Sequence, residues 1–417
     1  MAKLIIEDRC ALKGTVKVNC AKNAILPIMA ASLLTGEKCI LKEVPYLDDV
    51  GIMEEVTKSI GVEIERQNNR LAITAAEIKN YEATYELIRK MRASFLIMGP
   101  MLARIGKVKI SLPGGCAIGT RPIDLHLKGF SIMGASITLG HGYIEAYADK
   151  LKGDTIYLDF PSVGATENLM MAACLAEGIT VIENAAEEPE IVDLANFLNK
   201  MGGCIKGAGT DTIRIEGVKD LKGTTHVAIP DRIEAGTYMI AAAATGGDVV
   251  VDGVVTEHLK PVTAKLKEMG AEVHEYERSI RVKATGRLNS VDIKTMPYPG
   301  FPTDMQSQMM TAMCISNGTS IATETVFENR FMHINELKLM GAKIKVDGRS
   351  AIIEGCDKLS GAKVKATDLR AGAALTIAGL CAEGGTEISD IYHIDRGYIK
   401  IEEKLQKLGA LIKRAEE

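Results

Sequence analysis

The sequence has few of the features that mark nucleic-acid binding or membrane insertion. Of its 417 residues none is Trp and 4% are aromatic, and the formal net charge is −4. A nucleic-acid platform needs a basic face and stacking rings, so no nucleic-acid partner is expected. No apolar run reaches membrane-spanning length, and the first residues contain no signal-peptide core. We therefore expect no membrane association and a cytoplasmic protein.

Motifs for metals, disulfides and nucleotides are also missing. The nine cysteines are an odd number and include no C-x-x-C pair, and there is no H-E-x-x-H and no G-x-x-x-x-G-K-[ST]. These absences predict reduced thiols, no metal site and no nucleotide P-loop. Apolar residues make up 47% and charged residues 25%, as in ordinary globular proteins. A chain of this length forms two or three domains.

An internal repeat is the main feature that is present. Six amphipathic helical segments each end at a glycine followed by a short β-like run, at intervals of about 70 residues. These glycines are Gly61, Gly134, Gly202, Gly270, Gly341 and Gly409. An earlier helix in each unit is rich in Ala and Met and apolar on nearly all sides, which predicts burial. The unit therefore consists of a strand, a buried helix, a strand, an exposed helix and a strand pair.

The chain ends indicate how the six units group. The last unit stops at Glu417 without its strand pair, while the N-terminal Ile5-Ile6-Glu and Leu12-Lys-Gly14 match the spacing of such a pair elsewhere. We predict an α/β fold of two domains, each with three pseudo-symmetric units and central helices, and an active-site cleft between them. The first domain is 22–229, and the second combines 1–21 with 230–417. A six-unit solenoid is the rival, although its ends need not meet.

One unit carries an extended loop with a thiol. Leu112-Pro-Gly-Gly-Cys116-Ala-Ile-Gly-Thr-Arg121-Pro follows a strand-like run and precedes an amphipathic helix. A helix start and a nearby Arg lower the pKa of a cysteine. The extra residues favour a functional lid over a tight turn with an incidental cysteine.

Polar residues gather where the buried helices begin. These residues are Lys22, Asn23, Arg92, Ser162, Asp231, Arg232, Asp304, Asp368 and Arg370. Helix N-termini with Lys and Arg form a site for phosphate or carboxylate. The alternative is that Asn, Ser and Asp are ordinary N-caps. Cations sit poorly at a helix N-terminus unless an anion is bound there.

Five motifs together resemble the UDP-N-acetylglucosamine 1-carboxyvinyltransferase family, the enolpyruvyl transferases of peptidoglycan synthesis. They are Asn19-Cys-Ala-Lys22-Asn23-Ala, the Cys116 loop, Ser162-Val-Gly-Ala-Thr-Glu-Asn, Phe301-Pro-Thr-Asp304-Met-Gln and Thr367-Asp368-Leu-Arg370-Ala. The resemblance covers essentially the whole chain. It implies two inside-out α/β domains. It also implies transfer of the enolpyruvyl group of phosphoenolpyruvate to the 3′-hydroxyl of UDP-N-acetylglucosamine, with release of phosphate and no cofactor or metal.

The resemblance also implies a role for each site residue. Cys116 is the acid and forms a covalent adduct with phosphoenolpyruvate, Asp304 is the base, and Asp368 assists proton transfers. Lys22, Arg121 and the catalytic Arg396 hold the phosphate, and Arg330 and Arg370 face the carboxylate. The nucleotide-sugar contacts are Asn23, Arg92, Arg121, Pro122, Ile123, Asp124, Leu125, Ser162, Val163, Gly164, Asp304 and Val326. No oligomer is required for these contacts.

Two positions separate this chain from some members of that family. Phe160-Pro161 stands where some carry Lys-Val, so their charged nucleotide contact is in question here. Others carry Asp at the Cys116 position, whereas the thiol here predicts alkylation by fosfomycin. Two alternatives remain: the shikimate-pathway enolpyruvyl transferase, whose N-terminal Ser-Lys-Ser pattern is absent, and a non-catalytic paralogue that binds the UDP-sugar.

Overall fold

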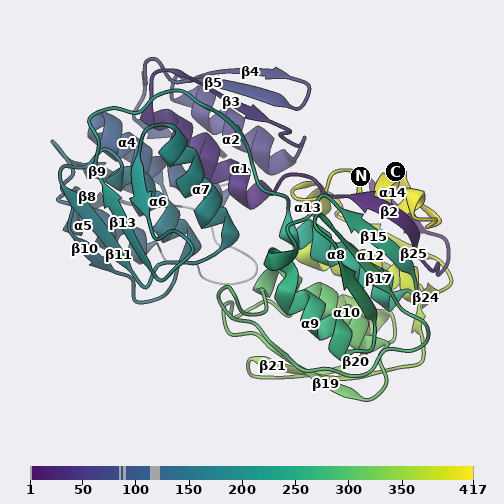
Figure 1. Ribbon diagram of the computed structural model, residues 1–417. Coiled ribbons are helices and arrows are strands. Elements are labelled where there is room, and N and C mark those ends of the chain that lie inside the picture. The colour runs from purple at the N-terminus through teal and green to yellow at the C-terminus, as the bar shows by residue number, and fades with distance from the viewer. Residues whose placement is uncertain (1, 84–85, 88–90, 113–122, 417) are drawn as a thin grey trace. The chain divides into compact units, whose positions relative to one another are not determined.

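The computed structural model describes residues 2–83, 86–87, 91–112 and 123–416. These residues form two compact units (Figure 1). The terminal unit contains the described residues up to Asn19 and from Pro230 onward, and the middle unit contains those between Cys20 and Ile229. The chain therefore starts and ends in the same unit.

Three four-stranded sheets of one topology lie in the described part of the middle unit. In each sheet the first two strands are parallel, and the other neighbours are antiparallel. The sheets are β14 (Thr225–Val227)–β3 (Lys38–Lys42)–β5 (Arg70–Thr74)–β4 (Glu63–Gln67), β6 (Glu82–Ala83)–β7 (Lys107–Ser111)–β9 (Tyr143–Tyr147)–β8 (Ser136–Leu139), and β10 (Thr155–Tyr157)–β11 (Ile179–Glu183)–β13 (Thr212–Glu216)–β12 (Cys204–Lys206). Because β14 joins the sheet of β3, the last repeat closes onto the first.

The described residues of the terminal unit repeat this topology three times and add a short strand pair, β22 (Leu359–Ser360) with β24 (Ala382–Glu383). The sheets are β2 (Lys13–Lys17)–β15 (Asp248–Asp252)–β17 (Ser279–Lys283)–β16 (Glu272–Glu275), β18 (Ile293–Lys294)–β19 (Thr319–Thr323)–β21 (Ser350–Glu354)–β20 (Lys343–Asp347), and β23 (Lys363–Lys365)–β25 (Thr386–Ser389)–β1 (Lys3–Ile6)–β26 (Ile412–Ala415). β1 pairs with both β25 and β26, so strands from the two ends of the chain complete the sixth sheet (Figure 1).

Each unit has central helices that are buried along most of their length. The central helices are α1 (Lys22–Ala31), η2 (Arg92–Ile97) continuing into α4 (Met98–Ile105), and α6 (Val163–Ala173) in the middle unit, and α8 (Arg232–Ala244), η4 (Thr303–Met305) continuing into α10 (Gln306–Cys314), and α12 (Leu369–Cys381) in the terminal unit. Their Ala-rich and Met-rich surfaces allow close packing of α8, α10 and α12 against one another.

The short η1 (Ser32–Leu34) continues α1 and is buried as well. The remaining helices are mostly amphipathic and lie farther out. They are α2 (Asp48–Ser59), α5 (Asp124–Ile132), α7 (Pro189–Lys200), η3 (Thr256–Leu259), α9 (Lys260–Glu268), α11 (His333–Leu339), α13 (Tyr392–Asp395) and α14 (Ile401–Lys407). In the part of the chain that is described, no helix is long and apolar enough to cross a bilayer.

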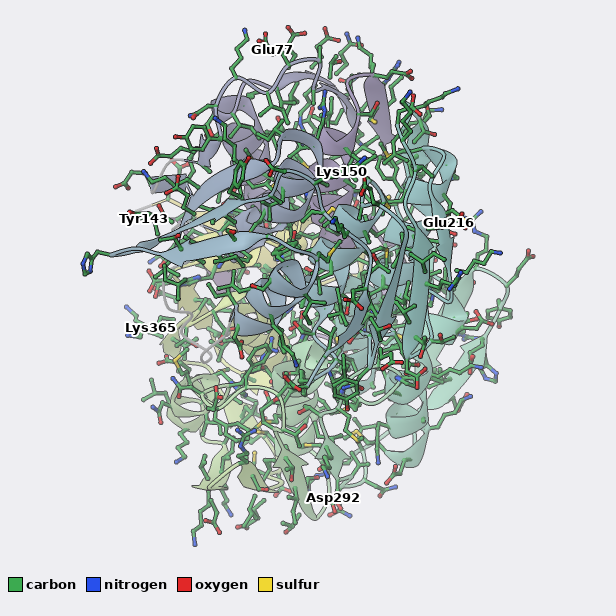
Figure 2. The ribbon with its side chains drawn as sticks, turned by 90° about the vertical axis from the view of Figure 1, so that its left-hand side faces the viewer. Glu77, Tyr143, Lys150, Glu216, Asp292 and Lys365 are labelled. Atoms are coloured by element: carbon green, nitrogen blue, oxygen red, sulfur yellow. The ribbon has the colours of Figure 1, made fainter. Side chains whose placement is uncertain are left out.

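The repeat has a clear backbone cause. All six repeat glycines have a positive φ, between 92° at Gly341 and 103° at Gly202. This left-handed conformation strains any residue with a Cβ and ends a helix cleanly. The strands that follow alternate, as in β13, where Ile213 and Ile215 are buried and Glu216 is exposed. Figure 2 shows Glu216 among the outward-pointing side chains of the sheets. The predicted fold class, two α/β domains of three repeated units, is confirmed.

Candidate active site

A cluster of buried charges centres on Asp304, in the turn η4. Arg330 Nη2 donates to its Oδ1 at 2.6 Å, and Arg370 Nη2 donates to its Oδ2 at 2.8 Å. Both arginines are buried, with 4% of their surface exposed. Burial alone raises the pKa of the Asp304 carboxyl, but the two guanidiniums outweigh it and hold this pKa well below its usual range.

A hydrogen-bond chain through Thr303 to Glu324 fixes Arg330. Its Nη1 donates to Thr303 Oγ1 at 2.7 Å, and that hydroxyl donates to Glu324 Oε2 at 2.9 Å. Glu324 also accepts from Thr295 Oγ1 and from the backbone N–H groups of Val326 and Phe327. The buried Glu324 carboxylate therefore ties the Asp304 turn to the loop that carries Val326.

A second network fixes Arg370. Its Nη1 donates to Tyr398 Oη at 3.3 Å, and Tyr398 Oη lies 2.8 Å from Thr237 Oγ1. Gln308 Nε2 donates to the Asp304 carbonyl at 3.0 Å. Burial raises the pKa of the Tyr398 hydroxyl, which therefore stays protonated. Each arginine therefore binds Asp304 through Nη2 and is held by a second partner, Thr303 or Tyr398, through Nη1.

Two histidines, the buried His333 and the half-buried His393, lie near charged residues of this cluster. Burial lowers the pKa of His333 to about 4, with Asp368 opposing the shift and Arg330 adding to it. Burial, together with Arg396, also lowers the pKa of His393. Both imidazoles are therefore neutral near pH 7. Asp368 thus lies within electrostatic range of both histidines, Arg330 within range of His333 and Arg396 within range of His393.

The helix starts support the N-cap alternative for three predicted residues. Asp231 accepts from the N–H groups of Ile233 and Glu234, and Asp368 accepts from those of Arg370 and Ala371. Ser162 Oγ accepts from Ala165 N at 3.4 Å. Capping satisfies N–H groups that a helix leaves unpaired, so these side chains have a structural role in the fold.

The two buried cations at helix starts each have an internal partner that the sequence does not reveal. Lys22 and Arg370 pair with carboxylates of the protein itself, and binding of a ligand anion beside them stays a prediction. Lys22 Nζ lies 2.9 Å from Asp49 Oδ2, with 10% and 3% of the two side chains exposed. Arg370 has Asp304. Each buried charge is compensated before any ligand binds. Asn23, next to Lys22, is exposed.

A buried amide joins three segments of the middle unit. Asn168 Oδ1 accepts from Gly99 N at 2.7 Å, and Asn168 Nδ2 donates to Phe95 O and to His126 Nδ1, both at 3.1 Å. Since the Gly99 N–H needs the amide oxygen, the amide nitrogen faces His126, and Nδ1 of that ring must be an acceptor. The ring lies against Gly164, where an added Cβ would be 3.4 Å from Cε1.

The Asn168 hub therefore connects the segments predicted to hold the nucleotide sugar. It links η2, which begins at Arg92, to α5, whose first turn holds Asp124 and Leu125, and to the start of α6. Ile123 precedes α5, and Ser162, Val163 and Gly164 lie half-buried at the α6 start. Phe160 is 45% exposed. Cys116, Arg121 and Pro122, and the side chain of Arg92, lie outside the described residues.

Sequence reasoning missed several residues of these networks. Sequence reasoning assigned no role to Glu324, Thr303, Tyr398, His333, His126 and Asn168, although Thr303 and Asn168 stand inside motifs that carry the family resemblance. Whether the middle-unit and terminal-unit residues serve one substrate stays a prediction. Within the described ranges, no three His, Cys, Asp or Glu residues are grouped to hold a metal ion.

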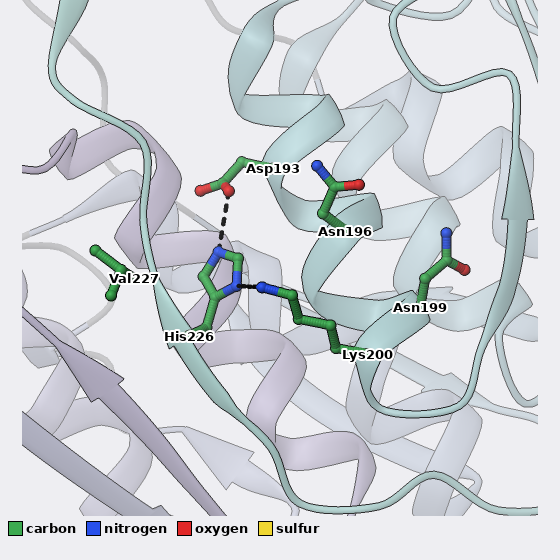
Figure 3. Close-up of a pocket in the computed structure, with 6 residues that line it drawn as sticks. All are labelled: Asp193, Asn196, Asn199, Lys200, His226 and Val227. Carbon is green, nitrogen blue, oxygen red and sulfur yellow. Dashed lines mark hydrogen bonds and ion pairs between the residues drawn. The ribbon is translucent and has the colours of Figure 1, made fainter. Parts of the chain in front are cut away.

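A hollow of about 520 Å³ elsewhere in the middle unit contains none of the predicted residues (Figure 3). His226 Nε2 lies 2.9 Å from Asp193 Oδ1, and Lys200 Nζ lies 3.2 Å from His226 Nδ1. Asp193 Oδ2 also accepts from Ile229 N. These contacts anchor the segment that leads out of the unit.

Known proteins are similar to this chain over nearly its full length. The family model "EPSP synthase (3-phosphoshikimate 1-carboxyvinyltransferase)" matches residues 6–405. A UDP-N-acetylglucosamine 1-carboxyvinyltransferase 1 from Caldanaerobacter subterraneus is 65% identical over 412 residues, 99% of each chain. One from Carboxydothermus hydrogenoformans, numbered 2, is 62% identical over 99% of each chain.

Solved structures show the same fold at low identity. The enolpyruvyl transferase NikO from Streptomyces tendae has a TM-score of 0.89 at 22% identity, over 99% of each chain. An EPSP synthase from Acinetobacter baumannii has a TM-score of 0.76 at 20% identity, over 99% of this chain and 100% of that one.

Proposed function

Since the chain belongs to the EPSP synthase (3-phosphoshikimate 1-carboxyvinyltransferase) family, we propose that it is an enzyme that transfers a carboxyvinyl group to UDP-N-acetylglucosamine. The observation that carries this choice within the family is the 65% identity over 99% of both chains to a relative of that name. The group comes from phosphoenolpyruvate, and its acceptor is the 3′-hydroxyl of the sugar. Phosphate is released.

The proposed mechanism is addition followed by elimination. The sugar oxygen bonds to C2 of phosphoenolpyruvate while Asp304 takes the hydroxyl proton and Cys116 protonates the methylene carbon. A tetrahedral ketal results. Loss of a proton from the methyl group and of phosphate from C2 then restores the double bond. General acids and bases each typically contribute 10²–10⁴-fold.

The charged residues support this assignment. Two buried guanidiniums on one carboxylate, Asp304, form a region suited to a substrate with a carboxylate and a phosphate. Arg330 and Arg370 take the carboxylate, and Lys22, Arg121 and Arg396 take the phosphate. Asn23, Arg92, residues 121–125, residues 162–164 and Val326 hold the nucleotide sugar. Asp368 assists proton transfer.

The wider role follows from the reaction. The product is a committed precursor of peptidoglycan, so the proposal places the chain in cell-wall synthesis in the cytoplasm, with effects on cell shape and division. Retention of Cys116 makes fosfomycin an expected inhibitor.

One assay separates this function from its rivals. Purified protein with phosphoenolpyruvate and UDP-N-acetylglucosamine is expected to release phosphate, and with shikimate 3-phosphate it is not. Release only with shikimate 3-phosphate favours the shikimate-pathway enzyme, and binding of the UDP-sugar without release favours a silent paralogue.

A pair of substitutions tests the thiol. We expect Cys116→Ser to lose turnover, because an alcohol is too weak an acid, and Cys116→Asp to keep much of it while resisting alkylation by fosfomycin. Cys204→Ser, at a half-buried cysteine of β12, is the control and should behave like the unaltered enzyme. Full activity of Cys116→Ser contradicts the acid role.

A further inference from the structure

Asp304 is assigned to accept a proton, yet both of its oxygens are already bound. Arg330 holds Oδ1 at 2.6 Å and Arg370 holds Oδ2 at 2.8 Å. A carboxylate whose charged form is stabilised in this way has a lowered pKa and is a weak base. Asp304 therefore has to leave at least one arginine before it can act on a hydroxyl group efficiently.

The two arginines form a carboxylate site in their own right. Their side chains are 3% and 5% exposed, and Thr303 and Tyr398 hold their far sides. Arg330 Nε is buried and donates to no acceptor among the described residues. The site therefore has a donor that Asp304 does not use.

The carboxylate of Asp304 is the outer layer of this cluster. Its side chain is 25% exposed, several times more than either arginine. It stands in the three-residue turn η4, so rotation of one side chain can move it while the arginines keep their other partners. A ligand reaches Asp304 first and the guanidiniums behind it.

We propose that Asp304 is the internal occupant of a carboxylate site formed by Arg330 and Arg370, and that the carboxylate of phosphoenolpyruvate displaces it. This inference rests on the proposed function. The arginines exchange one carboxylate for another, and Asp304 becomes free to take the proton of the sugar hydroxyl as its oxygen bonds to C2. A substrate without a carboxylate cannot displace Asp304, which then stays bound to the arginines and cannot act as the base. The exchange therefore also selects for substrates that carry a carboxylate.

A neighbouring aspartate provides the matched control. Asp368 lies in the same unit and carries the same charge, but it caps a helix by accepting from the backbone N–H groups of Arg370 and Ala371. Asn is an equally good N-cap. Asp368→Asn therefore removes a nearby charge without releasing the arginine side chains.

The test compares ligand affinities by calorimetry. We expect Asp304→Asn to bind phosphoenolpyruvate about tenfold or more tightly than the unaltered enzyme, because an internal competitor that holds the site nine-tenths of the time weakens apparent affinity tenfold. Inorganic phosphate, which has no carboxylate, should bind both proteins within about twofold. Asp368→Asn should not show the gain.

Several results overturn the exchange. They are unchanged or weaker binding of phosphoenolpyruvate to Asp304→Asn, an equal gain for inorganic phosphate, or an equal gain in Asp368→Asn. If Asp304→Asn does not fold, a structure of the unaltered enzyme with phosphoenolpyruvate decides, since both arginine contacts of Asp304 persisting beside the bound ligand refute the proposal. Failure of the proposed function is distinct, because the unaltered enzyme then releases no phosphate.

Discussion

In the terminal unit Asp304 is bound by two guanidiniums, whereas in the middle unit Asn168 joins three segments through neutral hydrogen bonds. The units share one sheet topology and one arrangement of buried helices. The difference therefore lies in the side chains and not in the fold. In these two networks the terminal unit relies on buried charges and the middle unit on a neutral amide.

Lys22 modifies this contrast without removing it. It forms a buried ion pair with Asp49 in the middle unit. Both units thus carry a cation at a central helix start that an internal carboxylate neutralises. In the terminal unit Asp304 pairs with two cations, Arg330 and Arg370, and in the middle unit Asp49 pairs with Lys22.

Removal of a guanidinium should have the largest effect. Arg370→Ala leaves Asp304 with one partner and Tyr398 Oη without its cation, and breaking a buried pair costs about 3–5 kcal/mol in the free energy of unfolding. Urea unfolding measures it. Arg281→Ala, which breaks an ion pair with Asp248 that is about a third exposed, is the control and should change stability far less. Equal losses of stability in the two variants would contradict the prediction that a buried ion pair contributes more than an exposed one.

Acid should destabilise the terminal unit through His333. Its pKa is lowered from 6.5 to about 4 in the folded chain, so the unfolded chain binds the proton first as the pH falls. Stability is therefore full above pH 6.5 and is lost toward pH 4, by about 3 kcal/mol for this group. His333→Gln should flatten unfolding free energy against pH in that window. His141→Gln, at an exposed histidine, should not flatten this curve. Identical curves for the two variants would contradict the assignment of the acid sensitivity to His333.

Loss of the neutral hub should cost less. Asn168→Ala removes the hydrogen bonds to the Gly99 N–H, the Phe95 carbonyl and His126 Nδ1, and we expect a loss of about 2 kcal/mol in the free energy of unfolding. It should also raise KM for UDP-N-acetylglucosamine more than KM for phosphoenolpyruvate, because the segments it joins are those proposed to hold the sugar. Asn199→Ala removes an exposed amide that also makes two backbone bonds, to Ile205, and is the control. An equal rise in both KM values contradicts the division of roles.

The repeat could be recognised from the sequence because its cause is local. A helix that ends in the left-handed region requires glycine, and this requirement recurs at all six repeat glycines. Helices rich in Ala and Met must be buried wherever they stand, and α10 and α12 are. The site could be predicted less completely from the sequence. Asp304 and Arg370 stood among the polar residues at the helix starts, whereas Arg330 came from the family resemblance alone. Glu324 and Tyr398 carried no signal.

The amino-acid order by itself determined the six units, their turns and their buried helices, since each depends on the conformation or polarity of neighbouring residues. Only the tertiary structure decided that Asp304 meets residues 26 and 66 positions away, and that a carboxylate of the chain occupies the arginines. Charge pairs act across space between groups of ordinary type, so nothing in the local sequence distinguishes a paired aspartate from a solvated one.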